Sequence, residues 1–283
     1  MLQISRSAQR DKIGGIARSK PITKTEPPPR LTPRKIGIVS RDYNRKYRNG
    51  FRDFSAAFDG ALRTLDEEGC DTVVFSLYSI VPRKGFRPLK SVHLQNVRSV
   101  LYQEFIDGRK REGGPCLVFY RRANKWHRYC LPVGGIPKLR GSKKAKQKRV
   151  EEFKREAMPG RILGNCCAIL CGEINCVPYH PSTGRVGDDF GLRRSIPPEV
   201  TVVLNPGHDW MSRFEMPLKR KFLSQQGRWV ISLWNKGKRG KNRKPRDAKG
   251  DPWTIFHDGR EVCVEPEENH IGVYIGIVET GEA

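Results

Sequence analysis

Short, uninterrupted apolar runs constrain the fold of this chain more than any other feature. Thr72–Ile80 (TVVFSLYSI) and Val200–Pro206 (VTVVLNP) show no alternation of polar and apolar residues. Such a run is typical of a strand that is covered on both faces, whereas a strand with one face in water alternates. Further strands are predicted at Lys35–Ser40, Arg228–Asn235 and in the C-terminal VYIGIVE. We therefore expect sheets with layers on both sides.

Helical periodicity lies between several of these strands. Apolar residues recur every three or four positions from Phe51 to Glu68, across Asn96–Ile106 and from Phe214 to Leu223, which predicts three helices with one apolar face each. CLVFYR and WHRYCL read as two short strands, and Asp258-Gly259 is a strong hairpin signal. Strands that alternate with helices and also pair as hairpins predict a layered α/β fold.

Composition separates a tail from the folded part. Residues 1–34 are polar and basic and end in a proline-rich segment that favours neither helix nor sheet, so we expect a disordered tail. Residues 35–280 are expected to form one domain, with exposed basic insertions at about 138–157 and 236–250. No run approaches the ~18 apolar residues of a membrane span, and the N-terminus lacks the apolar core of a secretory signal. These features predict a cytoplasmic protein that does not enter a membrane.

The net charge points to an acidic partner. The chain has 54 basic and 30 acidic residues, a formal net charge of +24, and the segments Lys138–Arg149 and Lys236–Lys249 are almost free of acids. A positive field of this kind favours polyanions, with nucleic acid the obvious candidate. The alternative is that these basic segments are simply solvated.

Eight cysteines in a chain without a secretory signal are expected to be reduced thiols. Four of them crowd into one segment: Cys166, Cys167, Cys171 and Cys176. We predict no zinc site, because paired C-x2-C knuckles are missing and adjacent cysteines in a strand point to opposite faces. We expect neither a metal nor a cofactor.

Cys171 is the candidate nucleophile. It ends the apolar run Cys166–Leu170 and precedes Gly172. The carboxyl end of a strand in a layered α/β fold can expose a reactive side chain, and a tight turn at Gly172 would leave a backbone N–H to hold an oxyanion. A thiolate also needs a nearby cation or base, and Lys125 is a candidate cation. The competing interpretation is that Cys171 is a small core residue.

The order of the segments resembles the carbon–nitrogen hydrolase (nitrilase) superfamily, from Lys35 to about Val278. KIGIVS, the first helix and GCDTVVF are similar to the start of that fold. YRRANKWHRY is similar to the lysine motif, with Lys125 two residues before His127, and GRILGNCCAILCGEIN to the nucleophile strand. VTVVLNPGHDW, GRWVISLWN and FHDGREV follow in the family's order. Each motif is weak alone, but their order and spacing are fairly specific.

The resemblance implies a four-layer α-β-β-α sandwich with a Glu–Lys–Cys triad that hydrolyses a non-peptide amide or nitrile through a cysteine thioester. By position it implies that Cys171 is the nucleophile, that Lys125 stabilises the tetrahedral intermediate and that Glu173 is a supporting carboxylate. It also implies a homodimer or a larger homo-oligomer.

Four further residues are expected to line the substrate pocket. Two of them follow Cys171 in the turn after its strand, called the nucleophile turn below, and two follow the strand that ends in Asn-Pro: Gly172, Asn175, His208 and Asp209. We expect His208 and Asp209 to contact substrate rather than to catalyse, because neighbouring residues rarely face each other as a base and its orienting carboxylate.

One position departs from the family pattern. The resemblance implies a base glutamate just after the second strand, but the chain has Ser76-Leu77 there. General base catalysis contributes roughly 10²–10⁴ in rate, and leucine cannot supply it. Either the register is shifted, or Glu104 or Glu173 replaces the base, or the chain has kept the fold without turnover. The alternative function is therefore a catalytically degenerate protein of this fold that binds nucleic acid or another polyanion through its basic tail and loops.

Overall fold

The computed structural model describes residues 27–42, 55–78, 89, 92–106, 112–132, 134, 139, 141–208, 211, 213–237, 250–268 and 273–281. Several predicted features lie outside these described residues. They are most of the predicted tail, the first turn of the helix predicted from Phe51, Asp209, and most of the second basic insertion.

The first sheet has seven strands. Its three central strands are parallel, and antiparallel strands extend it on both sides. Residues of the first strand alternate between two buried faces, which explains its uninterrupted apolar sequence. The spatial order is β14 (Glu267–Glu268), β15 (Val273–Glu279), β1 (Lys35–Arg41), β2 (Thr72–Phe75), β3 (Ser99–Ile106), β4 (Glu112–Arg122) and β5 (Lys125–Cys130).

The second sheet has six strands and carries the candidate nucleophile strand. β7, β10 and β11 are parallel neighbours, and the outer strands are antiparallel. The hairpin predicted at Asp258-Gly259 joins β12 to β13. The spatial order is β13 (Arg260–Val262), β12 (Trp253–His257), β11 (Trp229–Leu233), β10 (Val202–Pro206), β7 (Cys166–Ala168) and β6 (Ile162–Leu163).

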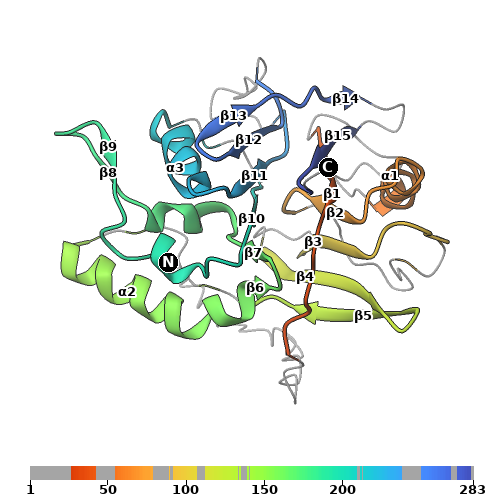
Figure 1. Ribbon diagram of the computed structural model, residues 1–283, viewed down its shortest axis with the longest axis horizontal. Coiled ribbons are helices and arrows are strands. Elements are labelled where there is room, and N and C mark those ends of the chain that lie inside the picture. The colour runs from red at the N-terminus through yellow and green to blue at the C-terminus, as the bar shows by residue number, and fades with distance from the viewer. Residues whose placement is uncertain are drawn as a thin grey trace, which may run out of the picture.

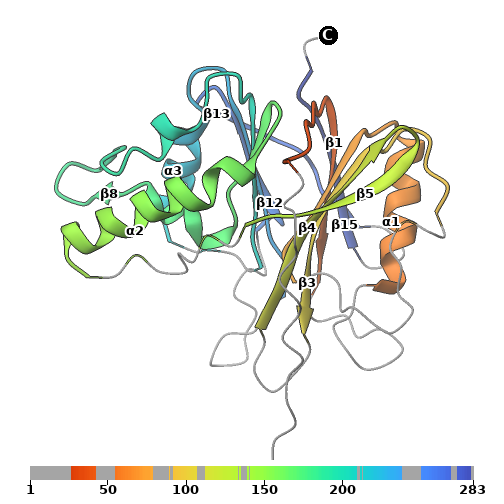
Figure 2. The same cartoon turned by 90° about the horizontal axis from the view of Figure 1, so that it is seen from below.

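The two sheets pack face to face between two helical layers (Figures 1 and 2). One buried cluster contains residues of both sheets, such as Ile38 of β1 and Leu204 of β10. A second cluster packs α1 (Ser55–Glu67) on the outer face of the seven-stranded sheet, and a third packs α2 (Lys143–Glu156) and α3 (Glu215–Ser224) on the outer face of the six-stranded sheet. The predicted four-layer α-β-β-α sandwich is confirmed.

The predicted helix over Asn96–Ile106 is wrong, because this segment enters strand β3. Val100 packs toward α1 while Leu101 packs between the sheets, so both faces are apolar and the sequence matches a helical spacing by coincidence. The carboxylate of Asp66 at the end of α1 accepts hydrogen bonds from the backbone N–H groups of residues 95–97, at 2.7–2.9 Å. These bonds hold the segment before β3 in an open turn.

The last residues of the predicted tail, 27–34, pack against the domain. Pro29, Leu31 and Pro33 are buried and alternate with exposed neighbours. The Leu31 N–H donates to the carbonyl oxygen of Leu163 at 3.1 Å. Gly164 lies against this segment with φ +71°, and a Cβ atom there would sit 2.4 Å from the Leu31 carbonyl oxygen. One buried leucine thus attaches a proline-rich segment to the sandwich.

The remaining elements are short. α3 contains Pro217 in its first turn, where the missing N–H has no helical partner to lose. Among the described residues, no helix has the length and hydropathy needed to span a bilayer. The short elements are η1 (Met158–Arg161), η2 (Cys171–Cys176), η3 (Arg193–Ser195), β8 (Tyr179–His180) and β9 (Arg185–Val186).

Candidate active site

The candidate site lies at the carboxyl ends of β7, β10 and β11. Because these strands are parallel neighbours, the residues that follow them meet at one edge of the six-stranded sheet. Cys171 follows β7, His208 follows β10 and Asn235 follows β11. The end of β2 reaches the same place from the other sheet, because the Leu77 N–H donates to the Gly207 carbonyl oxygen at 2.9 Å.

Cys171 differs from the other cysteines of its segment. Its side chain is partly exposed, whereas Cys166, Cys167 and Cys176 are buried. Burial raises the pKa of the Cys167 and Cys176 thiols to about 12, and it raises that of Cys166 as well. These buried thiols stay protonated at neutral pH, so Cys171 is the one cysteine of the segment suited to nucleophilic chemistry.

The backbone at Cys171 adopts an unfavourable conformation that hydrogen bonds hold in place. Its φ is +37°, a region that residues other than glycine rarely adopt. Asn205 of β10 holds the turn, since its Nδ2 donates to the Ile169 carbonyl oxygen at 2.6 Å and lies 3.5 Å from that of Cys171. The Ser232 hydroxyl in turn donates to Asn205 Oδ1 at 3.0 Å. A buried polar row across β10 and β11 therefore fixes where the thiol emerges.

The imidazole of His208 contacts the thiol directly. The distance from Cys171 Sγ to His208 Nδ1 is 3.1 Å, within the range of a hydrogen bond that involves sulfur. With the ring proton on Nε2, Nδ1 can accept the thiol proton. His208 was predicted to contact substrate, and its pairing with Cys171 could not be found from spacing because 37 residues separate the two.

Asn235 holds the backbone of His208 and occupies the region where a base glutamate was expected. Its Nδ2 donates to the carbonyl oxygens of His208 at 3.2 Å and of Leu77 at 2.7 Å. The Ser76 hydroxyl donates to Asn235 Oδ1 at 2.5 Å. Tyr78 packs its ring 4.9 Å from the His208 ring. Ser76-Leu77 thus joins the strand ends of the two sheets and supports His208.

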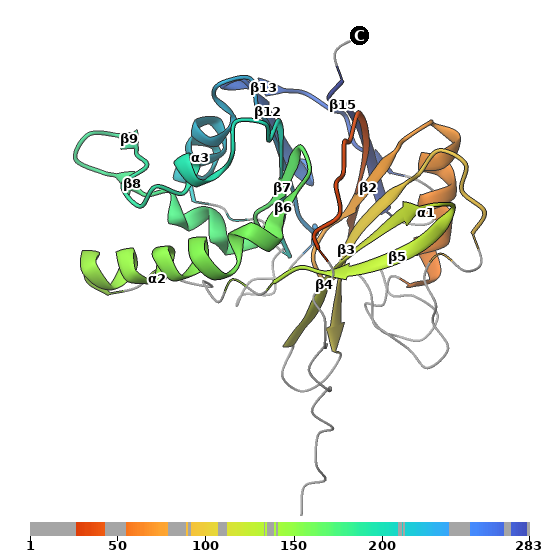
Figure 3. The same ribbon diagram turned by 60° about the horizontal axis from the view of Figure 1, so that its bottom comes forward.

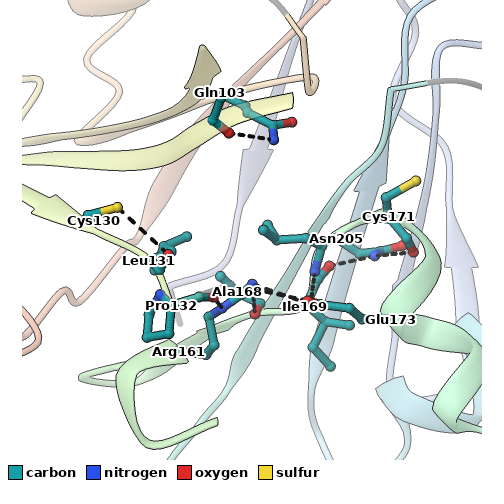
Figure 4. A network of polar contacts seen from close by, with 12 residues as sticks. Gln103, Cys130, Leu131, Pro132, Arg161, Ala168, Ile169, Cys171, Glu173 and Asn205 are labelled. Atoms are coloured by element: carbon teal, nitrogen blue, oxygen red, sulfur yellow. Dashed lines mark hydrogen bonds and ion pairs between the residues drawn. The ribbon is translucent and has the colours of Figure 1, made fainter. Parts of the chain in front are cut away.

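Glu173 lies in a buried ion pair below the nucleophile turn (Figure 4). Its Oε1 is 3.0 Å from Arg161 Nη2, and its Oε2 accepts from Arg161 Nη1 at 3.3 Å and from the Leu170 N–H at 2.7 Å. Burial raises the pKa of this carboxyl, and the Arg161 charge opposes the rise. In Figure 4 the Cys171 sulfur points away from the ion pair. With both oxygens engaged, Glu173 anchors the turn.

The structure does not bring Lys125 to Cys171. Lys125 is exposed at the start of β5, just after a turn at Ala123 and Asn124. The opposite end of this segment approaches the site, where the Pro132 carbonyl oxygen accepts from Arg161 Nε at 2.7 Å. Seven extended residues span about 23 Å. No contact joins the Lys125 and Cys171 side chains among the described residues.

Glu104 also lies away from the thiol. It is on β3 near Tyr102, which packs in the cluster that faces α1. Burial raises the pKa of Glu104, while the Arg128 charge and a hydrogen bond with Tyr102 oppose the rise. This carboxyl therefore belongs to the outer face of the seven-stranded sheet, on the far side from the nucleophile turn.

Arg220 of α3 is a cation within electrostatic range of Cys171. It is 2% exposed, its Nη1 donates to Thr254 Oγ1 at 3.1 Å, and its guanidinium lies 4.9 Å over the Trp234 ring. Arg220 Nε has no hydrogen-bond partner among the described residues. Burial lowers the pKa of Arg220 to about 10, and a negative charge at Cys171 opposes this. At neutral pH the guanidinium therefore stays charged and attracts a thiolate at Cys171. No sequence signal distinguishes Arg220 from the other basic residues.

The other three predicted pocket residues differ in their surroundings. Gly172 is next to the nucleophile, and its N–H makes no hydrogen bond within the described part of the chain. Asn175 is occupied, since its Oδ1 accepts from Arg213 and, at 3.3 Å, from the buried Lys219. Asp209 lies outside the described residues. Three or more potential metal ligands do not gather anywhere in the described ranges.

Neither a family model nor a curated protein matches the sequence. Among solved structures, the glutamine-dependent NAD(+) synthetase from Cytophaga hutchinsonii matches with a TM-score of 0.46 and 9% identity, over 87% of this chain and 43% of that one. An amidase from the nitrilase superfamily from Nesterenkonia AN1 matches with a TM-score of 0.45 and 12% identity, over 89% and 93% of the two chains. A carbon–nitrogen hydrolase from Helicobacter pylori G27 matches with a TM-score of 0.39 and 10% identity, over 88% and 90%.

The names of the amidase and of the carbon–nitrogen hydrolase include the group that the sequence motifs resemble. This chain spans less than half the length of the synthetase. Because every TM-score is below 0.5, the fold is assigned from the layers and strand order of the chain itself, and its chemistry from the contacts of its own residues.

Proposed function

We propose that this chain is a cysteine hydrolase that cleaves a non-peptide carbon–nitrogen bond, with Cys171 as the nucleophile and His208 as the base. The observation that carries the proposal is the 3.1 Å distance between Cys171 Sγ and His208 Nδ1 at a partly exposed thiol. A nucleophile and a base within hydrogen-bond reach, with the base held by a further group, is the arrangement that activates a cysteine. Here Asn235 holds the backbone of His208.

The first half-reaction forms a thioester. His208 Nδ1 takes the proton from Cys171 Sγ, and the sulfur attacks the carbonyl carbon of an amide. The electron pair of the carbonyl bond moves to the oxygen, and in this mechanism that oxygen accepts a hydrogen bond from the Gly172 N–H. His208 then gives its Nδ1 proton to the leaving nitrogen, the carbon–nitrogen bond breaks, and ammonia or an amine departs.

The second half-reaction releases the acid. His208 Nδ1 takes a proton from water, and the water oxygen attacks the thioester carbon. The carbon–sulfur bond breaks, the electron pair returns to sulfur, and His208 reprotonates the thiolate. Arg220 favours the thiolate at both ends of the cycle by charge attraction. In this mechanism His208 supplies the proton transfers for which the missing glutamate was expected, and Glu173 keeps the turn in place.

The test is to trap the thioester. The protein is incubated with a panel of short non-peptide amides and nitriles, the reaction is quenched in acid, and the intact mass of the protein is measured by mass spectrometry. We expect an acyl adduct that maps to Cys171 and disappears in Cys171→Ala, while Cys263→Ala, which removes an exposed thiol elsewhere, retains it. His208→Phe should slow its formation by about 10²–10⁴. No adduct with any member of the panel, or one that persists in Cys171→Ala, contradicts the proposal.

A further inference from the structure

The first half of α2 carries five cations that have no acidic partner among the described residues. They are Lys143, Lys144, Lys146, Lys148 and Arg149. The basic residues in the second half of the same helix are paired, since Lys154 Nζ lies 3.0 Å from Glu151 and Arg155 Nη2 lies 2.6 Å from Glu156. Within one helix, therefore, the cations of one half are paired with acids, and those of the other half have no acidic partner among the described residues.

This half of the helix also stands away from the rest of the protein. The two fully buried side chains of α2 are Val150 and Phe153, which pack on the outer face of the six-stranded sheet. Lys154 adds a hydrogen bond from its Nζ to the Phe190 carbonyl oxygen at 3.2 Å. Residues 143–149 are exposed or partly exposed, and Figure 3 shows α2 extending beyond the sheets. The helix is anchored at one end and presents the other to solvent.

The charge distribution opposes the helix macrodipole. The first turn contains Lys143 and Lys144 and no acid, although acidic side chains are the ones that stabilise the positive end of a helix. Each misplaced cation therefore costs the helix some stability. The Ser142 cap, whose Oγ accepts from the Ala145 N–H at 3.3 Å, recovers part of that cost. A polyanion would compensate both the unpaired charges and the dipole.

We infer that the first half of α2, Lys143–Arg149, binds the phosphate backbone of nucleic acid. The seven residues rise about 9 Å along the helix axis. Each strand of a duplex carries one phosphate charge per about 3.4 Å of the duplex axis, so one backbone presents about three phosphates to these cations over the same length. Backbone phosphates carry no sequence information, so the contact is expected to be independent of sequence. The inference does not depend on Cys171.

The experiment measures binding of the full-length protein to a short fluorescent DNA duplex and to a single-stranded RNA of the same length. Fluorescence anisotropy is recorded over a salt series from about 50 to 200 mM, the range in which phosphate contacts dominate the salt response. Three duplex contacts contribute a slope of about 2.7 in log Kd against log salt, or about 40-fold in Kd over this range. The α2 variant replaces all five cations of residues 143–149 by glutamine. We expect its slope of log Kd against log salt to be lower than the wild-type slope by up to this amount.

A matched control variant distinguishes an effect of this helix surface on binding from an effect of the total charge of the protein. It replaces five exposed arginines on other elements by glutamine: Arg63, Arg98, Arg122, Arg128 and Arg260. We expect the control to keep most of the slope, and thermal unfolding should show that both variants fold. The inference fails if the wild type shows no salt-dependent binding, or if both variants lose the same slope. Binding to anionic-lipid vesicles that depends on the α2 cations, with none to nucleic acid, also overturns it.

Discussion

Replacing Glu173 by glutamine tests whether this carboxylate anchors the nucleophile turn or acts as a base. Arg161 is 0% exposed and Glu173 6%, and Glu173→Gln leaves a buried guanidinium without its counter-charge. Removing one partner of a buried ion pair typically costs about 3–5 kcal/mol. Arg161 keeps two backbone acceptors, the carbonyl oxygens of Pro132 at 2.7 Å and Ala168 at 3.2 Å, so we expect the lower end, about 3 kcal/mol.

The loss of stability expected in Glu173→Gln comes from the charge that remains buried. Burial raises the pKa of Glu173 despite Arg161, so the desolvation of this carboxylate outweighs the attraction of Arg161 and the hydrogen bonds that it accepts. The loss in the single variant comes from the stranded Arg161. The double variant Arg161→Met with Glu173→Leu, which removes both charges, is therefore expected to be close to wild type in stability.

Thermal unfolding provides the measurement. A loss of about 3 kcal/mol corresponds to a fall in Tm of about 6–12 °C for a domain of this size. Alkylation of Cys171 should also slow in Glu173→Gln, because the turn that presents the thiol loses its anchor. If Glu173→Gln keeps the wild-type Tm while hydrolysis disappears, Glu173 is the base and the positioning role is refuted.

Two further predictions concern buried groups outside the thiol pair. Burial, with the nearby Arg213 charge, lowers the pKa of Lys219 to about 8 from its usual 10.5, so the unfolded chain binds more protons between these values. Lys219 should therefore contribute a rise of about 3 kcal/mol in the free energy of unfolding across this window, whereas the buried thiols, whose pKa is raised, contribute a fall. In pH-dependent urea titration, the stability of the wild type relative to Lys219→Met should therefore rise by this amount. Gly164→Ala should cost about 1–3 kcal/mol, because its Cβ would meet the Leu31 carbonyl oxygen at 2.4 Å. Gly184→Ala is the matched control, with φ +67° but open space, and equal Tm losses in the two would contradict the packing of the 27–34 segment.

The layers of the fold were predictable because the strands are covered on both faces. Uninterrupted runs such as Val200–Pro206 require two packed sides, and the motif order supplied the four-layer arrangement. The same property caused the error at β3, where apolar residues on both faces imitate a helical period. Leu31 was missed because one buried side chain in a proline-rich segment leaves no periodic pattern.

The candidate site was predictable in part. The end of an apolar strand pointed to Cys171, and its partial exposure is consistent with that role. The partners come from elsewhere in the chain. The parallel register of β7, β10 and β11 brings His208 into contact with the thiol, and the packing of α3 brings Arg220 within electrostatic range of it. Such long-range proximity cannot be predicted from the local sequence. Lys125 matched a motif, but it lies exposed at the start of β5, whereas the segment approaches Arg161 at Pro132, beyond the other end of that strand.

The pairing of Cys171 with His208 is tested most directly by the pH dependence of thiol alkylation. Iodoacetamide labelling is followed by peptide mass spectrometry between about pH 5 and 9, with the exposed Cys263 as an internal reference. In the wild type we predict that Cys171 reacts faster than Cys263 at neutral and mildly acidic pH, although it is less exposed, because His208 and Arg220 favour its thiolate. His208→Phe should remove most of that advantage. If Cys171 reacts no faster than Cys263, or if His208→Phe leaves its profile unchanged, the imidazole does not activate the thiol and the proposed mechanism is wrong.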